Sequence, residues 1–388
     1  MKKNKKIFII ILVIFVIILS VSVLGRNNII IYSKRDGLYN NKFKITDDTI
    51  NDVIILWDNK KVIYNNYKGL FLYYLNSNKN KKVDKQVNRV DVINKKYLLY
   101  EKNTKFYIYN MMTNKKEKIS IPNYFEVSND KTNLLFYNEG SFNIYNLNKN
   151  KIIISIKDVE DYKCINDSCT KLYYINTNRE LKINSKNKKI IDKNIYTILN
   201  ENKKAIVYTS YEEDKYALKV KKNFSKSIIL DTSKKIYDEA IINGNKIYYL
   251  VSGVCKESKL SGKNKRIITR NVDSFVNTYN DKIILVKGKD LYINNKKISE
   301  LINSDNIITS KNKIYYLKTK NDISSLYMNN GNKEKLIAKN VGMFIKHDNN
   351  IYYIGDYNVS QKYGNLYKVG SKKAIDKRVT SIVEKSIK

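Results

Sequence analysis

The chain has 388 residues, enough for about two or three average domains or for one large all-β body. Its 73 Lys and Arg residues against 37 Asp and Glu give a formal charge of +36, and nearly all the cations are lysines. This disfavours bidentate recognition by arginine and favours diffuse attraction to polyanions, unless the lysines form only a solvated surface. One histidine and three cysteines exclude a credible metal site.

The N-terminal segment has the pattern of a membrane anchor. Residues 1–6 form a basic leader, and residues 7–24 form an apolar run that would be roughly 27 Å long as a helix, at about 1.5 Å per residue. Since no A-x-A site or lipid-accepting cysteine follows, we expect a retained single-pass anchor, with residues 25–388 outside the cytoplasm. Cleavage of the leader would instead give a secreted protein.

The rest of the chain repeats. An apolar pair recurs about every 36 residues, at Ile31-Tyr32, Ile63-Tyr64, Leu99-Tyr100, Phe136-Tyr137, Tyr173-Tyr174, Val207-Tyr208, Tyr248-Tyr249, Ile284-Leu285, Tyr315-Tyr316 and Tyr352-Tyr353. Polar turns rich in Asn, Asp and Gly precede the pairs, as tight hairpins require. Short alternating runs before and after each pair, such as "KFYIYN" (105–110), predict four antiparallel strands per repeat.

A four-stranded unit of this size cannot bury its own face, so neighbouring units must cover it. Radial stacking predicts a β-propeller over residues 25–388. Residues 29–46 lack a first strand, and residues 378–384 resemble one, so we expect the C-terminus to complete the first blade. The pairs indicate one ring of eight or more blades; an open stack or two smaller rings are the alternatives.

The repeats also resemble a known group of proteins. The segment "NGNKIYYL…KLSGKNKRIITRNV" (243–272) recurs as "NKIYYL…SLYMNNGNKEKLIAKNV" and "NNIYYI…NLYKVGSKKAIDKRV". This is similar to bacterial propeller domains of unknown function related to the YWTD and TolB-type propellers, most clearly over residues 236–385. The resemblance implies an extracytoplasmic binding or scaffold module and names no ligand.

No catalytic motif is present. The sequence lacks G-x-S-x-G, H-E-x-x-H and P-loop patterns, and "SGKN" (261–264) is typical of a turn. His347 lies in "KHDNN", where we expect a solvated loop. We therefore predict a protein that is not an enzyme and needs no cofactor.

The cysteines predict at most one disulfide. Cys164 and Cys169 flank a hairpin turn, where a disulfide is sterically possible and an oxidising compartment would permit it; two buried thiols are the alternative. Cys255 has no evident partner.

Acidic residues recur near the first strand of many repeats, namely Asp52, Asp91, Glu126, Asp161, Glu239, Asp273 and Asp305. Because first strands line the axis of a propeller, these acids could form a ring in the channel that suits a cation or a cationic ligand. Simple polarity at the start of strands explains the same pattern.

Three functions remain open at this stage. The first is a membrane-anchored binding or scaffold module that engages anionic wall polymers, lipid headgroups or an envelope protein. The second is a glycan-active enzyme, which requires two carboxylates roughly 5 to 10 Å apart in an aromatic pocket. Nucleic-acid binding suits the charge but not the expected location.

Overall fold

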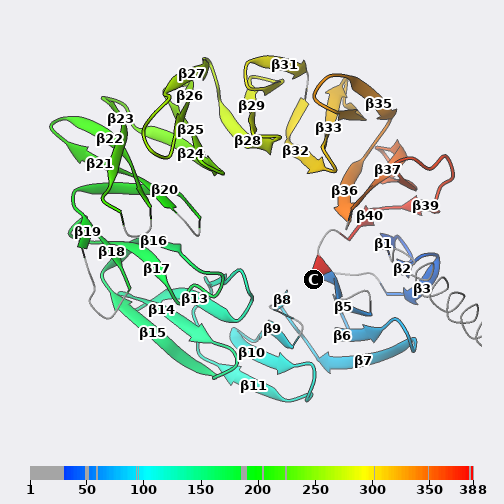
Figure 1. Ribbon diagram of the computed structural model, residues 1–388. Coiled ribbons are helices and arrows are strands. Elements are labelled where there is room, and N and C mark those ends of the chain that lie inside the picture. The colour runs from blue at the N-terminus through cyan, green and yellow to red at the C-terminus, as the bar shows by residue number, and fades with distance from the viewer. Residues whose placement is uncertain are drawn as a thin grey trace, which may run out of the picture.

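The chain folds into an all-β propeller of ten blades (Figure 1). This computed structural model describes residues 30–387 except 49–51, 58–59, 93, 95, 185–189, 203–204, 223–224, 301, 348 and 384–385. Nine sheets have four strands and one has five. The prediction of one ring with eight or more four-stranded blades is confirmed.

The predicted leader (1–6) and anchor (7–24) lie outside the described residues. Within the described part of the chain, no helix has the length and hydropathy needed to cross a bilayer.

Blades 1 to 5 occupy the first half of the chain. They consist of β1 (Ile31–Lys34), β2 (Gly37–Asn40), β3 (Phe43–Thr46) and β40 (Ser381–Ile382) in blade 1; β4 (Asp52–Trp57), β5 (Lys61–Asn66), β6 (Gly69–Tyr74), β7 (Lys79–Asp84) and β41 (Ser386–Ile387) in blade 2; β8 (Arg89–Val92), β9 (Tyr97–Lys102), β10 (Lys105–Asn110) and β11 (Lys116–Ile119) in blade 3; β12 (Glu126–Val127), β13 (Asn133–Asn138), β14 (Ser141–Asn146) and β15 (Lys151–Lys157) in blade 4; and β16 (Val159–Cys164), β17 (Leu172–Asn176), β18 (Leu181–Ile183) and β19 (Ile190–Asp192) in blade 5.

Blades 6 to 10 follow in order around the ring. They consist of β20 (Ile195–Asn202), β21 (Ala205–Glu212), β22 (Lys215–Lys222) and β23 (Ile228–Ser233) in blade 6; β24 (Tyr237–Asn243), β25 (Lys246–Val251), β26 (Val254–Lys259) and β27 (Arg266–Thr269) in blade 7; β28 (Ser274–Tyr279), β29 (Lys282–Lys287), β30 (Asp290–Ile293) and β31 (Lys296–Ser299) in blade 8; β32 (Ile302–Ser310), β33 (Lys313–Lys320), β34 (Ile323–Asn329) and β35 (Glu334–Ala338) in blade 9; and β36 (Met343–His347), β37 (Asn350–Asn358), β38 (Tyr363–Lys368) and β39 (Asp376–Val379) in blade 10.

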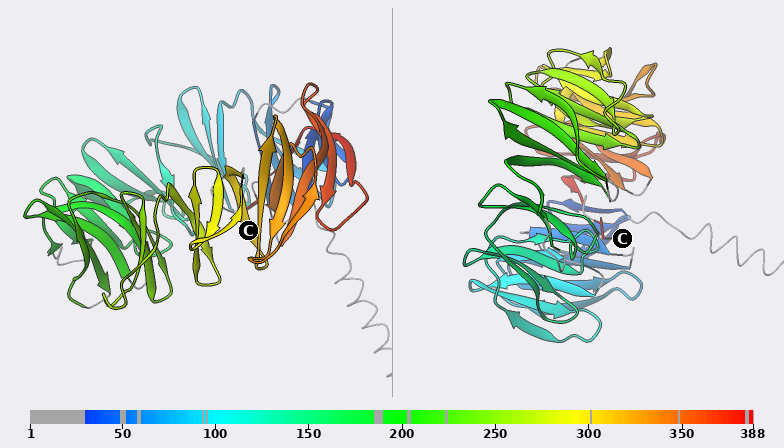
Figure 2. Two further views of the ribbon diagram at one scale, coloured as in Figure 1. Left: turned by 90° about the horizontal axis from the view of Figure 1, so that it is seen from above. Right: turned by 60° about the vertical axis from the view of Figure 1, so that its left-hand side comes forward.

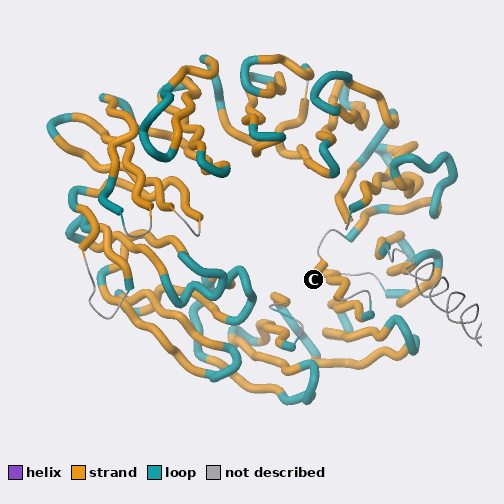
Figure 3. The backbone as a smooth tube through the Cα atoms, viewed as in Figure 1, coloured by secondary structure: helices purple, strands orange, loops and turns teal. Residues whose placement is uncertain are grey.

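Each blade is an antiparallel meander that runs from an inner first strand to an outer fourth strand (Figures 1 and 3). Nine of the ten apolar pairs lie in the second strand of a blade, counted outward from the axis; in blade 2, where β41 lies inside β4, the pair is in the third strand, β5. A second strand has sheet neighbours on both sides and a neighbouring blade against each face. It therefore carries consecutive apolar residues, as in β25, where Ile247 to Val251 are all buried.

The polar turns form the hairpins that the sequence predicts. Several contain two successive residues with positive φ, for example Asn280 (44°) with Asp281 (57°), and Lys311 (48°) with Asn312 (55°). Two such residues match the right-handed twist of the flanking strands, which explains the frequent Asn and Asp.

The hydrophobic core is divided among the contacts between blades. Ten buried clusters lie one at each contact between neighbouring blades, including the contact between blades 10 and 1. That last cluster joins Tyr32 of blade 1 to Ile345 and Val379 of blade 10. The ring is therefore closed (Figure 1), and Figure 2 shows the same ring from two further sides.

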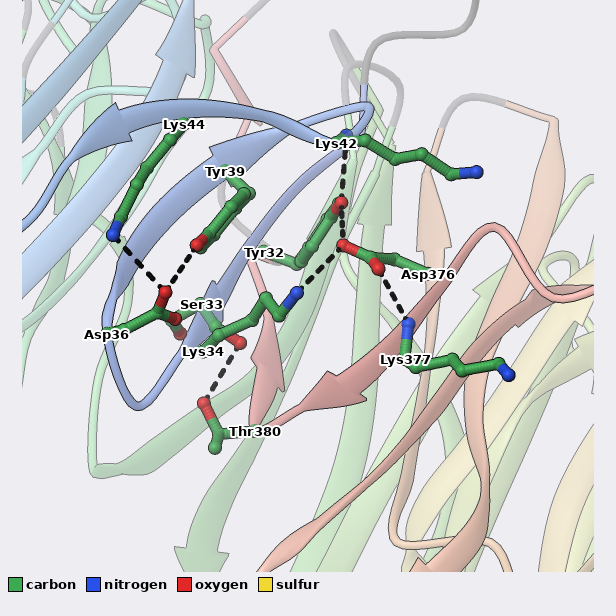
Figure 4. Close-up of polar contacts among 10 residues, drawn as sticks. All are labelled: Tyr32, Ser33, Lys34, Asp36, Tyr39, Lys42, Lys44, Asp376, Lys377 and Thr380. Carbon is green, nitrogen blue, oxygen red and sulfur yellow. Dashed lines mark hydrogen bonds and ion pairs between the residues drawn. The ribbon is translucent and has the colours of Figure 1, made fainter.

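The C-terminus closes the ring, as the sequence predicts. Strand β40 pairs with β1 through Tyr32 opposite Ile382 and Ser33 opposite Ser381. The N–H of Thr380 donates to the carbonyl of Ser33 at 2.9 Å. The Thr380 hydroxyl donates to the same carbonyl, also at 2.9 Å (Figure 4). The sequence did not predict β41, which adds a parallel strand beside β4 of blade 2.

Candidate binding pocket at the inner edge of blades 3 to 5

A pocket of about 600 Å³ lies where the inner strand of blade 4 is short. Strand β12 has two residues, whereas β8 has four and β16 has six. The segment before β12 contains Pro122, the only proline of the chain, which has no N–H for a sheet hydrogen bond. The strand therefore begins late, and the side chains of three blades meet in the space that remains.

Aromatic rings form the walls of this pocket. On one side the ring centroids of Phe142 and Tyr162 are 4.2 Å apart, and Tyr137 packs on Phe142 at 5.2 Å. Phe125 and Tyr124 lie on the segment that leads into β12. Tyr124 is 90% exposed and Tyr137 is 45% exposed, so their rings are accessible to a ligand.

The one arginine of the pocket has its charge matched within the protein. Arg89 Nε lies 2.6 Å from the carboxylate of Asp91, and its guanidinium lies 5.0 Å from the ring centre of Phe125. It also donates to the carbonyl of Asn123 at 3.0 Å. These contacts hold the Arg89 side chain in place in the pocket lining, and Asp91 balances its charge.

The carboxylate of Glu126 is differently placed. It accepts a hydrogen bond from the Tyr162 hydroxyl at 2.7 Å, and the described residues form no ion pair with it. Burial first, and then this hydrogen bond, raise the pKa of Tyr162. Burial, with the charges of Asp161 and Glu126, raises the pKa of Tyr137 to about 12. Glu126 therefore gives the pocket a carboxylate that has no ion-pair partner among the described residues.

The seven acids singled out in the sequence lie in or directly before the inner strands of seven different blades. The side chains of Asp52 and Asp305 lie outside the described residues. Asp161 accepts the N–H of Tyr162 at 2.8 Å, and Glu239 accepts the N–H of Phe275 in the next blade at 2.9 Å. Asp273 accepts the N–H of Gly288. Of the acids whose side chains are described, Glu126 alone lines the pocket.

The cysteines lie away from the pocket lining. Cys164 and Cys169 are joined by a disulfide across the turn after β16, with their Cα atoms 4.7 Å apart. Cys255 is a free thiol in β26, fully buried. Burial, followed by the charge of Glu257, raises its pKa to about 12.

The expectation that His347 lies in a solvated loop is wrong. It is the last residue of β36 and only 4% exposed, with its ring edge toward Tyr352 at 6.3 Å between centroids. The alternation of buried and exposed residues in β36 extends through His347, so the hairpin turns after it. The turn predicted at 261–264 is present, with Gly262 N–H donating to Lys259 at 2.9 Å.

A second pocket of about 360 Å³ lies between blades 8 and 9. Asparagines and lysines from hairpin turns line most of it, and the Tyr279 hydroxyl is already within 2.8 Å of the Asn312 carbonyl. It has one aromatic ring and no carboxylate in its lining. The pocket of blades 3 to 5 is therefore the stronger candidate.

Exposed cations follow the outer edge of the ring. Eight outer strands each carry at least one, and we call the first on each strand the perimeter cations: Lys44, Lys79, Lys116, Lys151, Arg266, Lys296, Lys335 and Lys377. Some are paired within the protein, as Lys116 is with Asp84 at 2.9 Å. The described residues form no ion pair with Lys79, Lys296 or Lys335.

No family model matches the sequence, and no curated protein matches it. Among solved structures, one titled as the eukaryotic initiation factor has a TM-score of 0.52 at 12% identity and covers 79% of this chain and 95% of that one. BamB from Moraxella catarrhalis has a TM-score of 0.40 at 8% identity and covers 69% and 93%.

The β-propeller domain of the Trilobed protease from Pyrococcus furiosus has a TM-score of 0.33 at 14% identity and covers 75% of this chain and 95% of that one. At such identities similarity concerns the fold alone. We therefore infer no activity of this chain from these proteins. The resemblance to bacterial YWTD and TolB-type propellers stays a prediction.

Proposed function

We propose that this protein is a membrane-tethered propeller outside the cytoplasm that binds anionic polymers of the cell envelope through its perimeter cations. Residues 7–24 would tether it, and the closed ring would hold the cations in fixed positions. The observation that carries the proposal is the placement of exposed lysines on the outer strands, in a chain of net charge +36. A row of like charges attracts a polyanion without precise geometry.

Lysines on outer strands also have a structural explanation, which has to be distinguished from polymer binding. The fourth strand is the free edge of each sheet, and charged side chains there prevent sheets of different molecules from pairing. Edge protection requires charge of either sign, whereas this perimeter is mostly cationic. A test of polymer binding separates the two explanations.

The test measures binding of the full chain, in detergent, to a poly(glycerol phosphate). We expect affinity to fall several-fold between about 0.05 and 0.2 M salt, as exposed charges are screened. The triple variant Lys79→Gln, Lys296→Gln, Lys335→Gln should bind about tenfold more weakly, at roughly 0.5 kcal/mol for each charge.

The matched control is Lys234→Gln, Lys235→Gln, Lys289→Gln, which removes the same charge from exposed turns. Equal losses in both variants, or binding that is insensitive to salt, would contradict a role for the perimeter cations. The predicted sidedness needs a separate experiment. Protease added to intact cells should degrade residues 25–388, and full protection would place the propeller in the cytoplasm and favour nucleic acid as the polyanion.

A glycan-active enzyme is the second candidate, because aromatic walls surround Glu126 in the pocket. Such an enzyme needs a second carboxylate, and Asp161 is a candidate, since its charge and that of Glu126 both raise the pKa of Tyr137. Release of reducing ends from envelope glycans that is abolished in both Glu126→Gln and Asp161→Asn would support it. Activity that survives either change would exclude this pair.

A further inference from the structure

The pocket of blades 3 to 5 combines exposed aromatic rings with a carboxylate that has no cationic partner among the described residues. Glu126 is exposed at the pocket, and Tyr124 and Tyr137 present accessible rings beside it. Arg89 does not supply the missing charge, because Asp91 holds its Nε at 2.6 Å. The chemistry of this pocket is therefore complementary to a positive group.

The adjoining inner strands carry two further carboxylates and one lysine. Burial raises the pKa of Glu201 on β20, the charge of Lys163 on β16 lowers it, and the charge of Asp161 on β16 raises it. Together with Glu126, these groups carry more negative than positive charge. This local excess of carboxylates favours a cationic ligand over an anionic one.

Elsewhere in the protein, a neighbouring tyrosine ring and carboxylate are both in contact with a lysine side chain. In blade 9, Lys318 Nζ lies 4.5 Å from the ring centre of Tyr327 and 2.7 Å from the carboxylate of Glu334. In blade 1, Lys34 lies 4.7 Å from the Tyr39 ring and 3.4 Å from Asp376. In each case one ammonium group contacts a ring and a carboxylate.

The pocket has the ring and the carboxylate, but not the ammonium. In the described part of the chain, no lysine or arginine lies over Tyr124, Tyr137 or Tyr162. We propose that the pocket binds an external ligand through an organic ammonium group, with Glu126 as counter-ion and Tyr124 and Tyr137 as the ring contacts. Ring faces attract such cations within about 6 Å of the centroid, and quaternary ammonium ligands use this contact.

A metal ion fits this pocket less well than an organic cation. Among the described residues, no three His, Cys, Asp or Glu side chains gather closely enough to hold a metal ion. A neutral sugar would use the rings but would leave the charge of Glu126 without a function. The organic ammonium uses both features, and its binding does not depend on the perimeter cations.

The experiment compares choline with 3,3-dimethylbutan-1-ol, its neutral analogue of the same shape, in titrations of the full chain followed by NMR or calorimetry. Nα-acetyl-lysine amide and N-acetylglucosamine serve as the primary ammonium and the sugar probes. We expect choline or the lysine amide to bind at least tenfold more tightly than the neutral analogue. Tighter binding of choline would indicate a quaternary ammonium ligand, and tighter binding of the lysine amide a primary one.

Three variants connect binding to the pocket. Glu126→Gln keeps the shape and should weaken choline binding about tenfold, and Tyr124→Leu should weaken it about fivefold. Because Tyr124 is 90% exposed, this second change leaves the fold intact. Glu239→Gln, on the inner strand of blade 7, should leave binding unchanged.

Affinities of both ammonium probes no higher than that of the neutral analogue would overturn the inference, as would binding of N-acetylglucosamine in preference to both ammonium probes. Absence of any ammonium binding would overturn it as well. The triple variant of Lys79, Lys296 and Lys335 should bind choline normally, so failure of the polymer-binding proposal and failure of this inference are distinguishable.

Discussion

The Tyr32 hydroxyl donates a hydrogen bond of 2.6 Å to the carboxylate of Asp376, 344 residues further along the chain (Figure 4). Lys34 Nζ approaches the same carboxylate at 3.4 Å, and the N–H of Lys377 donates to it at 2.7 Å. This polar contact joins the first blade to the last, beside the cluster that contains Tyr32 and Val379. The ring is thus closed by a buried tyrosine and a carboxylate as well as by β40.

The same contact recurs inside the ring. Tyr100 of blade 3 donates to Asp84 of blade 2 at 2.7 Å, and Tyr208 of blade 6 donates to Asp192 of blade 5 at 2.8 Å. In each case a tyrosine of the second strand reaches the end of the preceding blade's outer strand. The closing contact is therefore an ordinary contact between neighbouring blades, although its partners are far apart in the sequence.

Tyr32→Phe should lower the free energy of unfolding by about 1–3 kcal/mol, because the largely buried Asp376 loses the tyrosine hydroxyl and keeps only Lys34 and the N–H of Lys377 as donors among the described residues. Urea denaturation of the two proteins measures the difference. Tyr315→Phe is the matched control, since Tyr315 is buried and the described residues form no hydrogen bond with its hydroxyl. A change in Tyr32→Phe no larger than in the control would show that the closing bond contributes nothing.

Asp84 should make the protein sensitive to acid. Burial alone would raise its pKa, but hydrogen bonds from Lys102, Lys116 and Tyr100 outweigh burial and hold the pKa well below its usual value. The unfolded chain therefore takes up this proton first, at about pH 4. The stabilisation is fully present above that pH and is lost as the pH falls toward the folded pKa.

Asp84→Asn should accordingly cost about 2 kcal/mol at pH 7 and progressively less as the pH falls from about 4 to 2. Thermal unfolding across this range measures the effect. The control Asp322→Asn lies in an exposed turn and should follow the wild-type curve. A constant difference between Asp84→Asn and wild type at all these pH values would disprove the assignment.

The blades could be predicted from the sequence because each strand is a local pattern. A second strand such as β9 has consecutive apolar residues, and the polar turn "NKK" (94–96) precedes it, so both signals lie within a few residues. The completion of blade 1 was also predictable. Residues 29–46 lack a first strand, and residues 378–384 resemble a first strand that no further strands follow. Ring closure then required no information from distant pairs.

The contacts between blades were not predicted, although a signal was present. The outer strands repeat a short motif, "VDK" at 83–85 and "IDK" at 191–193 and 375–377. Its aspartates are the acceptors of the tyrosine bonds. The pocket was harder to predict from the sequence, because Arg89, Glu126 and Tyr162 come from three blades. The distances between these side chains depend on the angle between the sheets. The run "PNYFE" (122–126), with the only proline, was the local signal for an irregular blade.

Gly69→Ala should be among the most damaging substitutions of a small residue. Gly69 has a φ of 132°, and a Cβ there would lie 2.2 Å from the carbonyl oxygen of Asp84. Relief of that contact requires β7 to move, so the bond between Asp84 and Tyr100 would weaken too. We expect a loss of about 3 kcal/mol in urea denaturation.

Gly288→Ala provides the comparison for that substitution. Gly288 has a φ of 59° and nothing within 4 Å of the added Cβ. Its loss should be only about 1 kcal/mol, the cost of a left-handed conformation for a residue with a side chain. Equal losses at the two glycines would mean that backbone conformation, and not the contact with β7, decides the effect.

The thiols should distinguish the folded from the unfolded protein. Cys255 is fully buried and its pKa is raised to about 12, so the native protein should resist iodoacetamide at pH 8. Denaturation without reductant should expose Cys255 alone, and reductant should add Cys164 and Cys169. Mass spectrometry of the alkylated chains counts them. Three labels without reductant would show that the protein matures with its thiols reduced, contrary to the expected location outside the cytoplasm.

Deletion of residues 380–388 should open the ring. It removes the Thr380 and Val383 hydrogen bonds to β1, each 2.9 Å long, and the buried side chain of Ile382. Two backbone bonds and one buried isoleucine amount to about 4 kcal/mol. Deletion of residues 384–388 keeps β40 and removes only β41, so it should cost far less. Urea denaturation compares the two truncated proteins. Limited proteolysis should cut residues 30–46 faster in the protein that lacks residues 380–388 than in the one that lacks only residues 384–388. Equal stability of both would show that the apolar contact between blades 10 and 1 closes the ring without β40.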